Sequence, residues 1–246
     1  MFNQGIDTIK TAQIDWWVNG SKQKGFNFSG SVAPGESQLV TLGSATFISG
    51  NNLIEAVFDS INGNVDQVRN DTLKINQAPG LSGNYTIGGS SADFNTFSDA
   101  INVLNKSGVC GSVNFTINNA TYSGSNTLGP VEGLNKNNTL TFDGQDSSKT
   151  IITHNGSTDR TTLRLSGLRW VTFKNIGFRT TGTSRSWALH FNEACRNIRF
   201  ENCQITANTS GTTQDVIGLV ASASRTSQAV NGDNVESLNI LNCRFE

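Results

Sequence analysis

Several charged residues could together bind an anionic ligand, because they lie in or beside short apolar segments that follow one another along the chain. Arg164 lies in TTLRLSG and His190 in SWALHFN, and alternation would point both side chains away from the apolar ones. Cations in such a set can bind the carboxylates of an acidic glycan. The candidate ligand-binding residues are Arg160, Arg164, Arg185, His190 and Asp215, with Asp159 and Glu193 beside them.

Catalysis by this set would need more acids than the sequence places there. A polysaccharide lyase needs a base for the proton alpha to a uronate carboxyl and a cation for the developing charge. A glycoside hydrolase needs paired carboxyl groups. The apolar Val220 follows Arg164 and His190 at the equivalent position of the next segment. We therefore predict no catalytic residue, and a lyase or hydrolase is the alternative.

Two further residue sets could bind metal. Asp59, Asp66 and Asp71 lie in the loop DSINGNVDQVRND, whose oxygens could hold Ca²⁺, although the spacing differs from that of a helix-loop-helix calcium loop. Turns that use Asx side chains explain the same residues without metal. His154 and His190 lie too far apart in the sequence pattern to share a metal, and we expect surface imidazoles. The prediction is no cofactor, with Ca²⁺ as the alternative.

The four cysteines lack the paired spacing of a zinc site and are too few for a disulfide scaffold. Cys203 and Cys243 occupy equivalent positions in two repeats of one sequence pattern. A column of buried thiols and a disulfide both remain open, and Cys195 could reach a neighbouring repeat.

The repeated pattern is two apolar residues, an asparagine and two more apolar residues. It occurs in WVTFKNIGF, NIRFENCQI and SLNILNCRF, where it aligns Asn175, Asn202 and Asn242, and TLTFDGQ has Gly144 at the same position. Asparagine and glycine adopt left-handed backbone angles most readily, so this column predicts a sharp corner between two strands. The spacings of 31, 27 and 40 residues leave room for a third strand in each repeat.

We expect the third strands at 161–167, 186–192 and 216–222. Leucines at alternate positions and Trp187 would then face inward, and Arg164 and His190 outward. The stacked asparagine amides would hydrogen-bond along the column.

This pattern resembles the right-handed parallel β-helix of the pectate lyase-like families, whose asparagine ladder lies at such a corner. The resemblance covers about residues 84–246 and implies the fold, but the same scaffold hosts enzymes and inert stalks. An amphipathic segment precedes the repeats, with Phe94, Phe97, Ile101 and Leu104 at helical spacing. It predicts a short capping helix with Asp93 as N-cap and Gly108 beyond its end.

Residues 12–76 read as short alternating strands separated by turns, which is typical of a small antiparallel sandwich. The order of WWVNG, VTLG, GNNLIEAVF and NDTL resembles the immunoglobulin-like CARDB modules of large bacterial surface proteins. We therefore predict an all-β chain in two domains: an immunoglobulin-like sandwich over 1–78 and a capped parallel β-helix over 79–246. The last coil would leave an open strand edge at Glu246, so we expect a fragment of a longer protein.

Charge and composition exclude some classes of binding partner. The 18 basic residues nearly balance the 19 acidic ones, which argues against nucleic acid, and no apolar run is long enough for membrane insertion. CARDB followed by a β-helix resembles large adhesins of gliding, type IX-secreting bacteria. The resemblance implies a secreted or cell-surface stalk that binds glycans or surface proteins. The alternatives are a lyase-like enzyme acting on acidic glycans and a subunit of a secretion or motility assembly.

Overall fold

The computed structural model describes residues 1–48, 51–67, 71–156, 159–184, 186–210, 216–221 and 235–246. The chain forms two units, Met1–Pro79 and Gly80–Glu246, and each is described by itself. None of the helices in the described residues is long and apolar enough to cross a membrane.

The first unit contains one antiparallel sheet with β1 and β4 at its centre. Asn19–Gly20 connects β1 to β2, and Asn62–Gly63 connects β4 to β5. All four of these residues have positive φ, as the favoured two-residue hairpin turn requires. The strands are β1 (Ile9–Val18), β2 (Ser21–Lys22), β3 (Phe26–Val32), β4 (Asn52–Ile61), β5 (Asn64–Val65) and β6 (Leu73–Gln77).

One face of this sheet is apolar but only partly covered. Ile14, Trp16 and Val18 of β1 are buried, whereas Leu73 and Ile75 on β6 are exposed. All strands described in this unit belong to the same sheet, and the second layer of a sandwich is not among them. The all-β class is confirmed, and the immunoglobulin-like sandwich stays a prediction.

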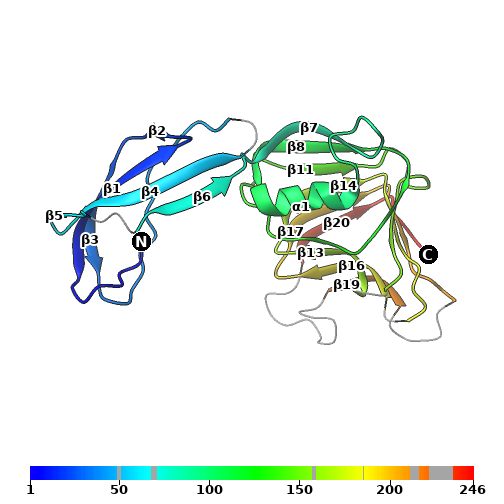
Figure 1. Cartoon of the computed structure of the whole chain (residues 1–246). Helices are drawn as coiled ribbons and strands as arrows, with labels where there is room; N and C mark the ends of the chain where they lie inside the picture. Colours follow the sequence, from blue (N-terminus) through cyan, green and yellow to red (C-terminus); the bar gives the residue numbers. More distant parts are fainter. Residues whose placement is uncertain (49–50, 68–70, 157–158, 185, 211–215, 222–234) are drawn as a thin grey trace. The chain divides into compact units, whose positions relative to one another are not determined.

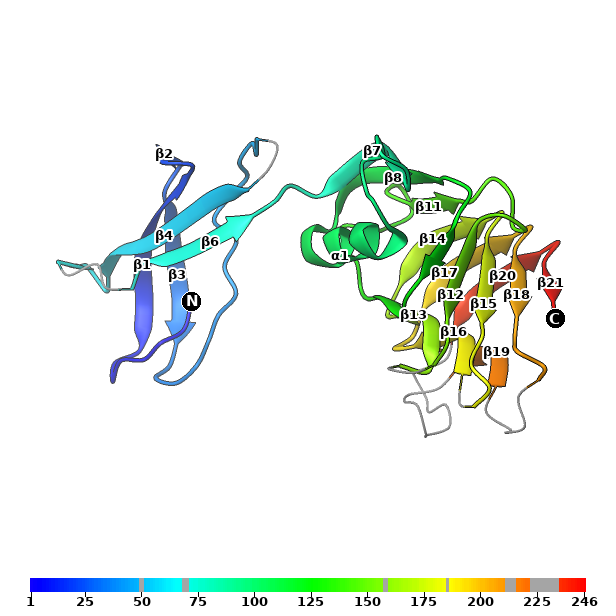
Figure 2. The ribbon, with the colours of Figure 1, turned by 45° about the vertical axis from the view of Figure 1, so that its right-hand side comes forward.

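The second unit is built from stacked coils, and the coils that begin at β8, β11, β14 and β17 each have one strand in each of three parallel sheets (Figures 1 and 2). We name these the first, second and third sheet. The first contains β7 (Leu81–Ile87), β8 (Val109–Ile117), β11 (Leu140–Asp143), β14 (Arg169–Lys174), β17 (Arg196–Glu201) and β20 (Glu236–Leu241). The second contains β9 (Thr121–Ser123), β12 (Ile151–His154), β15 (Gly177–Thr180), β18 (Gln204–Thr206) and β21 (Arg244–Phe245). The third contains β10 (Asn126–Leu128), β13 (Thr161–Ser166), β16 (Ser186–Asn192) and β19 (Val216–Ala221). The fold of this unit is a parallel β-helix, as predicted.

The register between coils places identical side chains above one another in the core. Phe115, Phe142, Phe173 and Phe200 occupy paired positions in the first sheet. Their neighbouring ring centroids lie 4.9, 5.2 and 5.1 Å apart with the rings nearly parallel. These separations match the spacing between strands of about 4.8 Å, so the coil spacing itself sets the aromatic stack.

Asn175, Asn202 and Asn242 lie at the corner between the first and second sheets with φ of 56°, 54° and 51°. The Asn202 amide donates to Asn175 Oδ1 over 3.3 Å, and the Asn175 amide donates to Asp143 Oδ1 over 2.8 Å. A carboxylate therefore accepts the last bond of the ladder. No side-chain hydrogen bond of Asn242 is found within the described part of the chain.

The role expected for Gly144 is wrong. Its φ is not positive, and the left-handed residue in this coil is Gln145, with φ 63°. Gly144 is needed for a different reason, because a Cβ there would lie 2.3 Å from the backbone oxygen of Asn175. Close packing of successive coils, and not backbone handedness, selects glycine at this position.

Helix α1 (Phe97–Ser107) lies beside the first strands of the stack and buries Phe97, Ile101 and Leu104 (Figure 1). The expected N-cap, Asp93, is wrong: Thr96 caps the helix in a reciprocal capping box with Asp99. Asp93 instead accepts hydrogen bonds from the backbone and hydroxyl of Thr86. Gly108 ends the helix with φ 65°.

Candidate functional site

The candidate site lies on the third sheet, where Arg164 of β13 and His190 of β16 are partners in register. Leu163, Leu165 and Leu189 are buried in the core, and Arg164 alternates with the first two. The partner of His190 on β19 is the apolar Val220. The parallel register therefore brings the two central candidates side by side on adjacent strands.

Arg164 connects a carboxylate to an imidazole. One terminal nitrogen of its guanidinium donates to Asp159 Oδ1 and Oδ2 over 3.1 and 3.3 Å. Its Nε donates to His190 Nδ1 over 3.2 Å. Because Nδ1 accepts this bond, His190 is neutral here and carries its hydrogen on Nε2. The Asp159 and Arg164 side chains are each 20% exposed, so the ion pair is partly desolvated.

Two groups fix the position of Asp159. The backbone N–H of Thr161 donates to Asp159 Oδ1 over 3.1 Å. His154, on β12, lies with Nε2 2.8 Å from the backbone oxygen of Asp159. A carbonyl only accepts, so His154 carries a hydrogen on Nε2. An imidazole from the second sheet thus holds the backbone that presents the carboxylate to Arg164.

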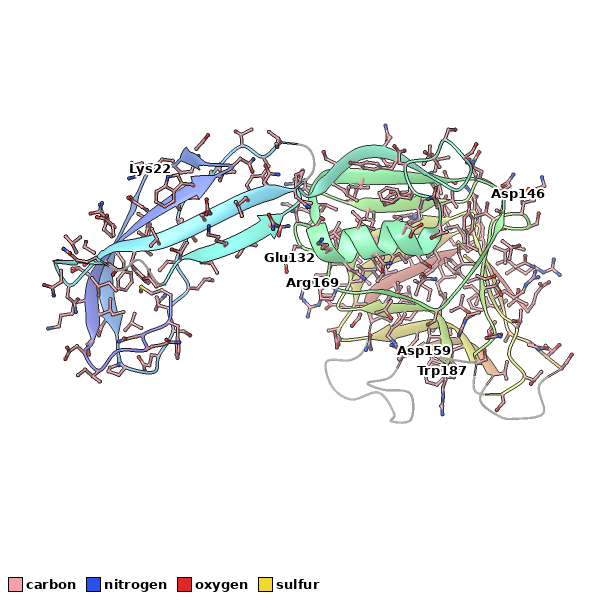
Figure 3. All side chains as sticks on the ribbon, in the orientation of Figure 1. Lys22, Glu132, Asp146, Asp159, Arg169 and Trp187 are labelled. Atoms are coloured by element: carbon pink, nitrogen blue, oxygen red, sulfur yellow. The ribbon has the colours of Figure 1, made fainter. Side chains whose placement is uncertain are left out.

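Trp187 completes the cluster at the same end of the third sheet, where Figure 3 labels it close to Asp159. Its ring centroid lies 5.0 Å from that of His190, and Arg160 Cζ lies 5.7 Å from it in a cation–π geometry. The indole is 5% exposed. Within the described residues, the buried Nε1–H of Trp187 and the hydroxyl of its register partner Thr161 have no hydrogen-bond partner. Such groups are costly to bury unless something satisfies them.

The prediction of surface imidazoles is wrong for both histidines. His154 is 9% exposed and His190 is 1% exposed. Strand alternation predicts whether a side chain points toward the core, but not whether neighbouring segments cover the outer face. Alternation likewise did not reveal that Trp187, expected as an inward core residue, contacts His190 and Arg160.

The other predicted residues do not join this cluster in the described part of the chain. Arg185 and Asp215 lie outside the described residues. Glu193 follows β16 and accepts a hydrogen bond from the hydroxyl of Ser166.

Asp59, Asp66 and Asp71 lie in the first unit. Burial raises the pKa of Asp71, and the Asp66 carboxylate raises it further. Across the described ranges, no group of three His, Cys, Asp or Glu side chains is placed to hold a metal ion. The Ca²⁺ alternative therefore has no described ligand cluster to support it.

All four cysteines are free thiols. Cys203 is buried, and its backbone N–H lies 3.4 Å from the sulfur of Cys243 on the next coil. Burial raises the pKa of Cys203 to about 12 and also raises that of Cys195. These thiols therefore stay protonated at neutral pH and act as core residues.

Comparisons with known proteins find similarity to solved structures only. A scan of protein-family models finds no match, and neither does a search of curated proteins. Solved structures that match include a pectin methylesterase from Aspergillus niger, with 19% identity and a TM-score of 0.44 over 67% of this chain and 50% of that one. The pectin methylesterase from carrot matches with 19% identity and a TM-score of 0.39 over 53% of this chain and 48% of that one. The enzyme from Erwinia chrysanthemi matches with 12% identity and a TM-score of 0.40 over 67% of this chain and 49% of that one. The chain spans about half the length of these structures. Similarity at this level carries no argument about activity, and the fold rests on the strand register.

Proposed function

We propose that this chain is part of a secreted or cell-surface protein whose β-helix binds an acidic polysaccharide on the outer face of the third sheet. The observation that carries the proposal is the cluster of Asp159, Arg160, Arg164, Trp187 and His190 on adjacent strands and the loop before them. It offers two guanidinium groups beside an aromatic ring on a rigid scaffold.

The chemistry of the cluster suits a chain of uronate rings. Guanidinium groups bind carboxylates with two parallel hydrogen bonds, and the buried Trp187 ring holds Arg160 in place through a cation–π contact. The Asp159 and Arg164 side chains are each 20% exposed, so a ligand carboxylate can reach the Arg164 guanidinium.

Binding without reaction is favoured because Asp159 is occupied by Arg164. A carboxylate held in an ion pair is a weak base. The stacked coils would serve as a stiff stalk that presents this face. The role of an adhesin, the CARDB-like first unit and binding to surface or secretion-system proteins belong to this proposal as predictions.

The second candidate is an enzyme that modifies acidic glycans, and one observation favours it. His190 is neutral, and Arg164 and Trp187 hold its ring. A neutral imidazole can act as a general base, and His190 would do so once Arg164 releases Nδ1, because its other ring nitrogen carries the hydrogen. In this case His190 would act on substrate while Arg164 neutralised the uronate.

The two candidates are separated by measuring binding and turnover in the same preparation. We expect hexagalacturonate to bind the full chain in isothermal titration calorimetry. Arg164→Met, which keeps the apolar stem, should weaken binding about tenfold, since a charged hydrogen bond contributes roughly 1.5–3 kcal/mol. The control is Arg196→Met, which removes an exposed arginine of the first sheet paired with Glu236. Equal loss in both variants would overturn the proposed site.

Turnover is followed as unsaturated product, new reducing ends and released ester groups from a panel of polyuronates. The binding proposal predicts no product in any of the three assays. Turnover that His190→Gln abolishes would instead establish the enzyme.

A further inference from the structure

A second candidate ligand site lies on the first unit, where four side chains form one row across the sheet. The register pairs Lys22 on β2 with Trp17 on β1, Trp17 with Glu55 on β4, and Glu55 with Lys74 on β6. Side chains directly opposite one another on neighbouring strands share a face. Two lysines therefore flank an indole and a carboxylate on one surface, and Figure 3 labels Lys22 on this sheet.

Contacts between these side chains hold the row in place. Lys22 Nζ lies 2.6 Å from Asp15 Oδ2 and 5.7 Å from the Trp17 ring. Lys74 Nζ lies 2.6 Å from Glu55 Oε1. The lysine side chains are 58% and 62% exposed, so both ammonium groups can also bind a ligand. The carboxylate partners are less accessible, with the Asp15 side chain 7% and the Glu55 side chain 24% exposed, so the ammonium groups are the more open part of the row.

An open depression with a volume of about 420 Å³ lies beside Trp17. This volume is in the range of small-molecule sites. Gly20 borders it in the hairpin turn with φ 77°, and a Cβ there would contact nothing within 4 Å. The turn therefore adds no side chain over this edge of the indole. The lining residues are Trp17, Gly20, Glu55, Val57, Thr72 and Lys74.

Trp17 is not needed for the core of this unit. Its neighbour Trp16 points to the opposite face, where it is buried and donates its Nε1–H to the backbone oxygen of Lys24 over 2.9 Å. Trp17 is only partly buried. An indole kept on the polar face of a sheet costs apolar exposure that a ligand would remove.

We infer that the row of Lys22, Trp17, Glu55 and Lys74 binds a neutral pyranose of a glycan. The indole can pack against the C–H face of the ring, and Glu55 and Lys74 can accept from and donate to neighbouring hydroxyls. Two lysines against Asp15 and Glu55 leave no net charge, so the row, unlike the third sheet, has no preference for uronates. This site goes beyond the proposed function, because it needs neither the third sheet nor an acidic sugar.

The test uses ¹⁵N-labelled full-length chain and a fixed panel of cellohexaose, maltohexaose, mannohexaose and hexagalacturonate. The indole Nε1–H signal of Trp17 is assigned with Trp17→Phe. We expect at least one neutral hexasaccharide to shift this signal saturably, and Trp17→Ala to raise its Kd by about tenfold or more. Glu55→Gln and Lys74→Met should each raise it by about three- to tenfold, as loss of a hydrogen bond of roughly 1 kcal/mol predicts.

Matched controls separate recognition from misfolding. Lys24→Met removes an exposed lysine of the same unit that lies outside the row, and Trp170→Phe removes a tryptophan of the β-helix. Both should bind the neutral hexasaccharide like wild type. The inference is overturned if no neutral hexasaccharide shifts the Trp17 signal, or if Glu55→Gln and Lys74→Met bind as tightly as Lys24→Met. Hexagalacturonate binding that depends on Arg164 tests the third sheet separately, so either site can fail alone.

Discussion

The two units of this chain use strands in opposite ways. In the β-helix, each coil buries its apolar residues on the coils next to it, and Phe142, Phe173 and Phe200 are fully buried. In the first unit, large apolar residues lie in water both on the single sheet, as Leu73 does at 56% exposure, and between its strands, as Leu39 does at 92% exposure. The comparison teaches that stacking supplies a core from repetition alone, whereas an isolated sheet needs a second layer.

The largest effect should come from the aromatic stack. Phe173→Ala removes a ring that contacts the rings of Phe142, Phe178 and Phe200. A buried phenylalanine replaced by alanine costs about 3–5 kcal/mol through lost burial and a cavity. Hydrogen exchange read segment by segment should show reduced protection throughout β11, β14 and β17.

The same experiment has a counterpart in the first unit. Leu39→Ala should change the protection of β1 and β4 by less than about 0.5 kcal/mol, because an exposed side chain loses little on truncation. A loss as large as that of Phe173→Ala would mean that Leu39 packs against the rest of the first unit.

The next effect concerns the asparagine corner. Asn175→Ala removes two side-chain hydrogen bonds. It also places alanine, which adopts left-handed angles less readily than asparagine, at φ 56°. The expected cost is about 2–3 kcal/mol, from roughly 1 kcal/mol per hydrogen bond and about 1 kcal/mol for the backbone. Asn175→Gly keeps the backbone angle and should lose less. Urea unfolding measures the free energy of unfolding of wild type, Asn175→Ala and Asn175→Gly.

Asn242 provides the comparison within the ladder, because it has the same backbone angle. Asn242→Gly should cost less than Asn175→Gly, because no side-chain hydrogen bond of Asn242 is found among the described residues. Equal costs would show that the ladder bonds contribute nothing beyond the turn.

A smaller effect is expected at His154, which donates to the backbone oxygen of Asp159. His154→Phe should lose this bond, cost about 1 kcal/mol and allow trypsin to cleave after Arg160. His154→Gln can still donate an amide hydrogen and should restore protection. If both variants resist trypsin like wild type, His154 does not position the loop.

The smallest effect is a pH dependence of stability that comes from Asp143, the acceptor of the last hydrogen bond of the asparagine ladder. Burial acts to raise the pKa of Asp143, but hydrogen bonds from Asn175, the Gln145 N–H and Lys174 outweigh it, and the net pKa is lowered. A carboxyl with a lower pKa when folded adds stability above its unfolded pKa of about 3.9 and loses it as pH falls through the folded value. Melting of Asp143→Asn between pH 6 and 3 should show a weaker pH dependence than wild type.

The sequence was sufficient to predict the coils because their determinants are local and repeated. Asn175, Asn202 and Asn242 indicate a left-handed backbone angle, and the apolar residues two positions before them, Phe173, Phe200 and Ile240, indicate an inward face. The predictions that were wrong depend on contacts with neighbouring segments, which the periodicity of the sequence does not describe. Gly144 is set by the backbone of the next coil, and His190 is buried although alternation points it outward.

The first unit was harder to predict for a related reason. Alternation in β1 identifies an apolar face, but says nothing about what covers it. The prediction of the N-cap of α1 was wrong because Asp93 and Thr96 both suit the sequence pattern. In the structure Asp93 accepts hydrogen bonds from Thr86, and Thr96 caps the helix. Local signals therefore predict elements, whereas contacts between segments decide which of two equivalent residues is used.

The central functional claim is that the outer face of the third sheet is the polysaccharide-binding face. Hydrogen exchange of the full chain with and without hexagalacturonate tests it most directly. The account predicts added protection at β13, β16 and the residues leading into them, Asp159 and Arg160, with the first and second sheets unchanged. Protection confined to the first or second sheet, or no protection at saturating hexagalacturonate, would contradict it.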